Sequence, residues 1–552
     1  MLNWFNHAKL VFTENSLFAI PILILCGTAS VALTVAAVKT RAKYMYLVIS
    51  VFIAVIIFFS AGHDTATHAF RSIILDESIE SGAPNLMIKF NEASLPIFYY
   101  YSTVIYTLTV PLIHFGISAV HAINLIGVVS FSLMAIGFLR VAQRATLVTS
   151  DNRDSAFLVG AAFLSVNYVY LNYIARGAIS EALSYSIVPV AVLAILNRNC
   201  ILSALLISFQ IMVHPVVFIQ SFVSEVAMLL ILDKALVRGI FTTLLIYLMA
   251  VAISAPFWLP QFIHKGAIRG VEALPVKFED TFLRLTSLID PGAFASFGPW
   301  FVILFIIVFS ISIRNATWQV KGCSAILIAT ILLQLQISEP WVVKLPILNL
   351  SLFVWRWMFV SAIIGATIIG VLWRERINHI ALIIVYLSGM SVIITSARYT
   401  IPTGKSFVLT NSAIRDSQDN VVWGVSEFMP NYSSFPQDCS QKLNSESIRV
   451  PYSRLREAPL IVNGPIMITN GPIGIVTYLR DGEAVKDIVA CDSSLVIPIL
   501  HSNTTVEVRG DTILDNPWLK ILLPIAVLLG ILGVLLSRRG WPRHKASIQP
   551  GA

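Results

Sequence analysis

The sequence predicts an α-helical polytopic membrane protein with about 13 transmembrane helices and a small β-rich extracytoplasmic domain near the C-terminus. Of the 552 residues, 57% are hydrophobic and only 12% are charged. Soluble domains carry roughly 25% charged residues, so this chain lacks the polar surface that several soluble domains would need. Apolar runs recur at about the 20-residue length that crosses a bilayer. The basic residues form short clusters between those runs, which is the pattern of cytoplasmic loops.

The apolar runs set the predicted spans, and we expect the first run to be a retained span and not a signal peptide. The predicted spans are 17–38, 45–61, 118–139, 155–172, 182–197, 199–213, 215–232, 240–258, 299–313, 322–338, 351–372, 377–395 and 517–536.

Basic clusters orient these spans, because cytoplasmic loops carry an excess of Lys and Arg. With these spans every cluster falls on one side, which is therefore predicted to be cytoplasmic. The net charge of +8 consequently does not indicate a nucleic-acid partner. The clusters contain Lys39, Arg41, Lys43, Arg140, Arg144, Arg153, Arg198, Lys234, Arg238, Arg314, Lys321, Arg374, Arg376, Arg538, Arg539, Arg543 and Lys545.

The segment 97–115 is apolar enough to be a span, but counting it would place every later basic cluster outside. We therefore predict a juxtamembrane or re-entrant helix there, at the end of an outer loop 62–96. Its run Tyr99 to Tyr101 suits a membrane interface.

Three parts of the chain follow from this topology. A transmembrane domain is predicted over 1–395, an extracytoplasmic domain over 396–516, and a final helix with a basic tail over 517–552. Short alternating runs bounded by Gly and Pro make the middle part β-rich. Cys439 and Cys491 fall in it, and a disulfide between them is left open. The other three cysteines, Cys26, Cys200 and Cys323, are expected to be apolar filler.

The first outer loop opens with Gly62, His63 and Asp64, followed by His68 and Arg71. Ionisable groups next to a span are costly and are often kept because they meet a ligand or an ion. An ordinary solvated carboxylate is the alternative for Asp64. A divalent metal held by His63, Asp64 and His68 is a further alternative, although the spacing does not require one.

The second outer turn carries Arg176, Gly177 and Glu181. Arg176 and Glu181 either pair with each other, or Arg176 offers its planar fork of donors to phosphate oxygens. Gly177 would permit a close approach of another backbone.

Three further polar positions stand at span ends or in the outer domain. His214 precedes a proline between two spans and is either structural or part of the site. Arg356 either snorkels outward between Trp355 and Trp357 as interface residues, or binds a phosphate in a polar environment. Glu427 lies in an isolated motif, Trp423 to Pro430, with no evident chemistry of its own.

The charge rule places Asp64, Arg176, Glu181, His214 and Arg356 at one membrane face, although they come from separate stretches. A carboxylate beside cationic groups is suited to attack on an activated, lipid-linked sugar, because it can accept a proton while the cations stabilise a phosphate leaving group.

These residues also carry a family resemblance. The strings at 62–71 and 173–181, together with His214, 258–260, 353–356 and 427–430, resemble bacterial membrane proteins labelled "6-pyruvoyl-tetrahydropterin synthase-related". The arrangement looks like the GT-C superfamily of polytopic glycosyltransferases, which use polyprenyl-phosphate sugars. That resemblance implies a functional carboxylate in the first outer loop, here Asp64, and does not imply pterin chemistry.

The expected function is an inverting sugar transfer from a polyprenyl-phosphate donor to a cell-envelope glycan or lipid acceptor, on the extracytoplasmic face of the bacterial inner membrane. Asp64 would deprotonate or orient the acceptor hydroxyl, and His63 would position Asp64. Arg176, Arg356 and His214 would hold the donor phosphate. The site would be supported by His68, Arg71, Glu181 and Glu427. No cofactor is predicted, and a divalent metal stays an alternative. The alternatives are a flippase for a lipid-linked glycan and a non-catalytic envelope assembly factor.

Overall fold

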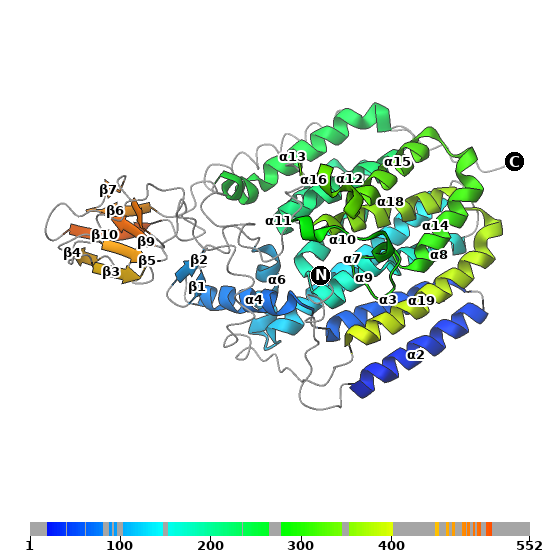
Figure 1. The fold of residues 1–552 in the computed structure, drawn as a ribbon, viewed down its shortest axis with the longest axis horizontal. Coiled ribbons are helices and arrows are strands. Elements are labelled where there is room, and N and C mark those ends of the chain that lie inside the picture. Colours follow the sequence, from blue (N-terminus) through cyan, green and yellow to red (C-terminus); the bar gives the residue numbers. More distant parts are fainter. Residues whose placement is uncertain are drawn as a thin grey trace.

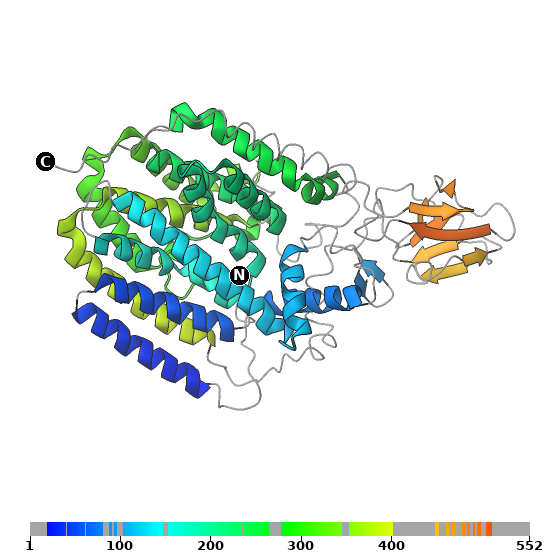
Figure 2. The same ribbon diagram turned by 180° about the vertical axis from the view of Figure 1, so that it is seen from behind.

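The computed structural model describes residues 19–39, 41–60, 62–80, 88–90, 93–95, 103–146, 153–233, 236–263, 278–344 and 353–400, with short segments between 448 and 509. This part of the chain is mostly helical, and the long helices lie side by side in one bundle (Figures 1 and 2).

The α-helices are α2 (Ala19–Val38), α3 (Ala42–Phe59), α4 (Thr65–Glu80), α6 (Val104–His114), α7 (Ala119–Thr146), α8 (Arg153–Leu164), α9 (Asn167–Leu171), α10 (Ile179–Leu196), α11 (Cys200–Val213), α12 (Pro215–Leu232), α13 (Leu236–Ile263), α14 (Pro299–Ser312), α15 (Trp318–Leu333), α16 (Glu339–Val342), α18 (Trp357–Leu372) and α19 (Asn378–Thr400). The shorter turns are the π-helical η2 (Asn172–Arg176) and the 3₁₀ turns η5 (Phe278–Thr281), η6 (Leu285–Leu288), η7 (Ile313–Asn315), η8 (Gln336–Ser338), η9 (Val354–Arg356) and η10 (Glu375–Ile377).

The protein is an integral membrane protein. Among the described residues, 7 helices are long and apolar enough to cross a bilayer, and an eighth span results if the two parts of 154–176, bent by 60° to each other, are counted as one. The 7 helices are α3, α7, α10, α12, α13, α18 and α19. Several of the other predicted spans correspond to apolar helices of 10–17 residues, and 517–536 lies outside the described residues. The predicted count of about 13 is therefore not confirmed.

The segment predicted to lie at the interface contains α6, which has only 11 residues. At 1.5 Å per residue it is about 16 Å long, roughly half the thickness of the hydrocarbon core. Its length agrees with the prediction that 97–115 does not cross.

Polar caps begin several helices where the sequence turns back. The side chains of Asn199 and Thr317 accept hydrogen bonds from the first turns of α11 and α15. His214 Nδ1 accepts from Val217 N at 3.3 Å, and Pro215 takes the first position of α12, where its missing N–H is not needed. His214 therefore has a structural role, which was one of the two alternatives predicted for it.

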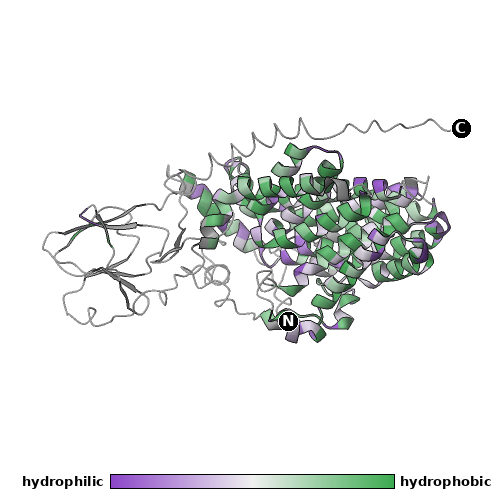
Figure 3. Cartoon of the chain, turned by 90° about the horizontal axis from the view of Figure 1, so that it is seen from above, coloured by the Kyte–Doolittle hydropathy of each residue, from purple (hydrophilic) through white to green (hydrophobic). Residues whose placement is uncertain are grey.

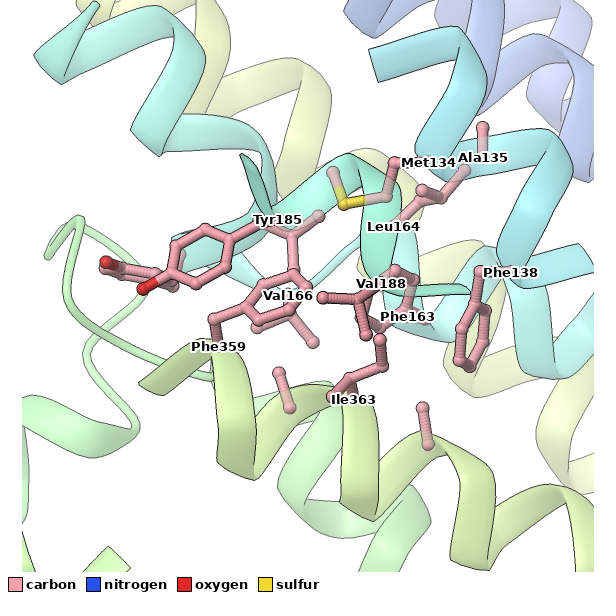
Figure 4. Close-up of a cluster of buried hydrophobic side chains, with 14 of the residues drawn as sticks. Met134, Ala135, Phe138, Phe163, Leu164, Val166, Tyr185, Val188, Phe359 and Ile363 are labelled. Atoms are coloured by element: carbon pink, nitrogen blue, oxygen red, sulfur yellow. The ribbon is translucent and has the colours of Figure 1, made fainter. Parts of the chain in front are cut away.

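The centre of the bundle is formed by α10 and α18. In their apolar stretches, 89% and 94% of the residues are buried. Tyr185 and Phe359 stack there with ring centroids 4.0 Å apart, and Phe138 stacks on Phe163 at the same separation (Figure 4). Cys26, Cys200 and Cys323 are buried and free, as expected for apolar filler.

Large apolar side chains are exposed on the outer helices, as in Val31 of α2 and Phe241 of α13. Hydrophobic residues predominate along the helices of the bundle (Figure 3). A water-soluble protein would bury such groups, whereas lipid accommodates them.

The turns of the bundle fall into two sets, which we call the basic end and the site end. At the basic end, Arg198 pairs with Asp233 at 3.1 Å, Arg144 donates to Asn197, and Arg374 and Arg376 occupy the α18–α19 turn. The α2–α3 turn with Lys39 and Arg41 precedes α3, whereas Gly62 follows its other end. The site end holds the starts of α10, α12 and α18 and the end of α3.

Among the described residues, strands occur in two places. Near α4, β1 (Ile88–Phe90) pairs with β2 (Ala93–Leu95). Between 448 and 509 there are two four-stranded sheets, in the orders β4-β10-β6-β7 and β3-β5-β9-β8, antiparallel except for the parallel pair β3–β5. The strands are β3 (Ile448–Pro451), β4 (Leu460–Val462), β5 (Ile466–Thr469), β6 (Thr477–Arg480), β7 (Glu483–Ala484), β8 (Val489–Cys491), β9 (Ser494–Ile497) and β10 (Thr504–Arg509).

The predicted β-rich domain over 396–516 is not confirmed as a domain. Residues 401–447 and most connections between these strands lie outside the described residues, and α19 continues to Thr400, beyond the predicted boundary. Cys439 and Glu427 also lie outside the described residues, so the disulfide and the role of Glu427 stay predictions.

Candidate functional site

The first loop is fixed at the end of α3 by hydrogen bonds to the backbone. The side-chain amide of Asn124, on α7, donates to the carbonyls of Phe58 at 3.1 Å and Ser60 at 2.6 Å. His63 N then donates to the carbonyl of Ala175 at 3.1 Å, and Asp64 N donates to that of Arg176 at 2.6 Å. The loop that carries Asp64 is therefore bound directly to the turn that carries Arg176.

That second turn is a π-helical segment that ends in a left-handed glycine. Gly177 has φ +65°, and its N–H returns to the carbonyl of Asn172. A Cβ on Gly177 would collide with Thr65, and one on Gly62 would collide with the backbone of Arg176 and Gly177. The close backbone approach expected at Gly177 is present, with Gly62 as its partner. Single π-helical turns are often found at functional sites.

An ion network runs inward from this contact. Arg176 Nη2 lies 3.5 Å from Asp64 Oδ2, and Arg176 Nη1 lies 3.0 Å from Glu181 Oε1. Arg356 Nε, from the start of α18, lies 2.9 Å from Glu181 Oε2. The Glu181 side chain is only 1% exposed, whereas that of Asp64 is 33% exposed. The network thus joins a buried carboxylate to one that reaches solvent.

The pairing of Arg176 with Glu181 was one of the two alternatives that the sequence left open. In the structure, Arg176 and Arg356 both pair with Glu181. Each guanidinium also lies over an aromatic ring. Arg176 Cζ is 5.8 Å from the centroid of Phe294, and Arg356 Cζ is 4.9 Å from that of Phe353. The face of an aromatic ring stabilises a cation that is removed from water.

Of the two alternatives for Arg356, the one in which it snorkels outward between interface tryptophans is wrong. Trp355 is 2% exposed, Arg356 5% and Trp357 6%. The reason is that η9 turns inward onto the loop before α14, where Trp355 packs edge-on against Phe294. Its ion pair with Glu181 can satisfy Arg356 there without lipid headgroups.

Two histidines lie around the network without carrying charge. Burial, together with Arg356, lowers the pKa of His214 to about 3. Burial, together with Arg71, lowers the pKa of His68 to about 4. Both rings are neutral at physiological pH, so His214 cannot bind a phosphate as a cation. His68 Nδ1 lies 3.0 Å from the hydroxyl of Tyr106, to which Arg71 also donates.

The partly exposed carboxylate of Asp64 is ionised. Burial alone would raise the pKa of Asp64, but the hydrogen bond from His63 and the charges of His63 and Arg176 outweigh it and hold that pKa well below its usual range. In return, the hydrogen bond to Asp64 raises the pKa of His63, against its partial burial. His63 Nδ1 and Asp64 Oδ1 are 2.8 Å apart, which supports the predicted positioning role of His63.

The structure does not favour the metal that was left open at His63, Asp64 and His68. His63 and Asp64 bind each other, while Nδ1 of His68 faces Tyr106. Among the described residues, the three side chains that could hold an ion together are Asp76, Glu80 and His114, which lie elsewhere.

Several side chains of the site were not singled out in the sequence. Tyr168 donates to Glu181 Oε1 at 2.7 Å, and Asn172 accepts from Arg176 at 2.9 Å. Tyr185 donates to the carbonyl of Arg356 at 3.1 Å. Asn172 stands four residues before Arg176, a spacing that places two side chains on one helical face, and this signal could have found it.

The family described as a 6-pyruvoyl-tetrahydropterin synthase related domain, a membrane protein, matches residues 98–401, which is more than half of the chain. The chain belongs to this family. No curated protein and no solved structure matches it.

The stretch matched by the 6-pyruvoyl-tetrahydropterin synthase related family contains Arg176, Glu181, His214 and Arg356, whereas Asp64 precedes it. The family assignment establishes a membrane protein and agrees with the family named by the resemblance, although the strings at 62–71 and 427–430 lie outside the matched stretch. The likeness to GT-C glycosyltransferases stays a prediction. It names no reaction for these residues.

The His63–Asp64 pair predicts a pH dependence of stability. Because the pKa of His63 is raised in the folded protein, its charged form stabilises the fold fully below its unfolded value of 6.5, and this contribution disappears as pH rises through the folded pKa. We expect it to be about 1 kcal/mol, since both groups are partly exposed.

The measurement is the thermal unfolding midpoint in detergent from about pH 5 to about pH 9, for wild type and His63→Gln. The difference between them should shrink toward alkaline pH. His379→Gln, an exposed histidine at the basic end, serves as control. A difference that grows with pH would contradict the expectation.

Proposed function

We propose that this protein is a membrane glycosyltransferase that moves a sugar from a polyprenyl-phosphate donor to a cell-envelope glycan or lipid acceptor on the extracytoplasmic face. The observation that carries the proposal is the contact of an ionised, solvent-reaching Asp64 with Arg176, 3.5 Å away, at the outer edge of a buried ion network. A carboxylate and a cation side by side provide what the two reacting partners of such a transfer need.

In the proposed reaction, the acceptor oxygen forms a bond to the anomeric carbon and the bond from that carbon to the donor phosphate breaks. The acceptor hydroxyl donates its hydrogen bond to Asp64. Because the pKa of Asp64 is low, the carboxylate orients the hydroxyl throughout and takes its proton only late, as the oxygen becomes acidic on bonding. His63 Nδ1 contacts Asp64 Oδ1 and keeps the carboxylate oriented toward the acceptor hydroxyl.

The leaving polyprenyl phosphate gains negative charge, which Arg176 would stabilise. Glu181 holds Arg176 at 3.0 Å and Arg356 at 2.9 Å, so the two guanidinium groups are fixed in advance. Preorganised charges of this kind need no rearrangement during the reaction. Arg356, the more deeply placed of the two, would act chiefly by holding Glu181.

The arrangement of charges supports an extracytoplasmic site. Basic turns occupy one end of the bundle, and Asp64, Arg176 and Arg356 occupy the other. Since an excess of basic residues marks cytoplasmic loops, the site end faces the other side in this proposal.

The test is a membrane assay with radiolabelled polyprenyl-phosphate sugars that compares wild type with Asp64→Asn. The variant should lose transfer by about a hundredfold or more, because Asn cannot accept the proton. Asp280→Asn, an exposed aspartate, is the matched control and should keep full activity. Full transfer by a stably inserted Asp64→Asn protein would overturn the mechanism.

The same assay separates the alternatives. A flippase would move the lipid-linked glycan without forming glycosidic bonds, and it would tolerate Asp64→Asn better than Arg176→Ala. An assembly factor would tolerate both and would instead lose function when 396–516 is deleted.

A further inference from the structure

A seam of polar contacts joins α4 to α6, beginning one turn after Asp64. His68 and Arg71 meet the hydroxyl of Tyr106, and further along α4 the hydroxyl of Thr109 donates to that of Ser72 at 2.9 Å. Both helices lie beside the end of α7 at which the site is found (Figure 1). The seam ends at His114, the last residue of α6.

At that end His114 meets two carboxylates that stand one turn apart on α4. His114 Nε2 lies 3.4 Å from Asp76 Oδ1, and His114 Nδ1 lies 3.7 Å from Glu80 Oε1. One ligand atom from each of the three residues lies within 4.8 Å of the others. Residues four apart on a helix share one face, so Asp76 and Glu80 can act on the same ion.

A second observation points to a missing partner. The Asp76 side chain is 13% exposed, and its Oδ1 accepts no hydrogen bond, although His114 Nε2 lies 3.4 Å away. A buried carboxylate oxygen without a donor is costly, and such groups are normally satisfied by a donor, a water or a metal. Burial raises the pKa of Asp76; His114 opposes this shift and Glu80 adds to it.

We propose that Asp76, Glu80 and His114 bind a divalent transition-metal ion of the Zn²⁺ or Mn²⁺ class. One imidazole nitrogen with two carboxylate oxygens suits these ions, whereas Ca²⁺ and Mg²⁺ prefer oxygen ligands alone. Ligands about 2.0–2.1 Å from a tetrahedral metal lie about 3.3 Å apart, close to the 3.4 Å between Asp76 and His114. Two carboxylates also supply the negative charge that a divalent ion neutralises.

Access and ligand exchange are compatible with this site. The Glu80 side chain is 61% exposed and that of His114 is 47% exposed, so an ion can enter without unfolding the seam. In this proposal Glu80 completes the ligand set, and water fills the remaining positions.

The ion would fasten the end of α4 to α6. Asp64 immediately precedes α4, and its carbonyl accepts from His68 N at 3.0 Å. Holding α4 in place would therefore hold the first loop, at a distance from the reacting groups. This inference does not depend on the proposed transfer, because metal binding is measured without any activity.

The experiment uses the full chain, purified in detergent and stripped with EDTA, with Zn²⁺ and Mn²⁺ titrated by calorimetry. One ion should bind per chain and raise the thermal unfolding midpoint. Since changes outside the ligand set already cost about 10–100-fold in affinity, Asp76→Asn, Glu80→Gln and His114→Gln should each weaken binding by about 100-fold or more.

Glu77→Gln, on the same helix but outside the trio, should bind as wild type does. No saturable binding to the wild type would overturn the proposal. So would unchanged affinity in His114→Gln, or loss of binding in His63→Gln alone, which would place the ion beside Asp64. Glu80 and His114 are exposed, so their variants report on binding even if Asp76→Asn folds poorly.

Discussion

Replacing Glu181 with alanine is expected to lower the free energy of unfolding by about 3–5 kcal/mol, because a buried ion pair that loses one partner leaves an uncompensated charge. Here two cations are affected at once. Arg176 at 3.0 Å and Arg356 at 2.9 Å both lose their carboxylate, and the hydroxyl of Tyr168 loses its acceptor. The measurement is the unfolding midpoint in detergent, combined with the yield of inserted protein.

The matched control is Glu375→Gln, an exposed glutamate at the basic end, which should change stability by less than about 0.5 kcal/mol. A second comparison isolates the pair. If Glu181 acts through Arg356, then adding Arg356→Leu to Glu181→Leu should recover part of the loss, because apolar replacement of a whole buried pair is often neutral. Strict additivity of the two single variants would contradict coupling between them.

The sequence predicted where the polar groups meet better than it predicted how they meet. Spans and basic clusters assign Asp64, Arg176, Glu181 and Arg356 to one face, because the alternation of direction depends only on counting apolar runs. The sequence offered the Arg176–Glu181 pair only as one of two alternatives and did not offer the Arg356–Glu181 pair. Both pairs depend on side-chain positions at the ends of α10 and α18, which no periodicity encodes. For the same reason the inward turn of Trp355 was not foreseen.

Two other features show what the apolar pattern hides. Glu225 lies inside the predicted span 215–232 and is fully buried, accepting from the hydroxyl of Tyr247 at 2.7 Å. A single carboxyl in an apolar run is itself a signal, since such groups are rare in membrane helices. By contrast, apolar length could not decide whether the shorter helices cross the bilayer. Helices such as α11 and α14 have 14 residues, fewer than the roughly 20 that a span needs.

Alanine at Gly62 or at Gly177 is expected to destabilise the protein by about 3–5 kcal/mol and to separate Asp64 from Arg176. The new Cβ at either position meets the facing loop, and for Gly62 the atoms it meets belong to backbone, which cannot rotate away. Gly177 adds the strain of φ +65° for a residue with a side chain. Yield and unfolding midpoint measure the stability, and the transfer assay measures the displacement of Asp64.

Gly322→Ala is the matched control, because Gly322 lies inside α15 and a Cβ there has nothing within 4 Å. That change should be neutral or stabilising by up to about 1 kcal/mol, since alanine favours a helix over glycine. The contrast between the two glycine classes tests the geometry itself. If Gly62→Ala folds and unfolds like Gly322→Ala, then the two loops do not dock backbone to backbone, and the hydrogen bond from Asp64 N to Arg176 that places the carboxylate beside its cation is absent.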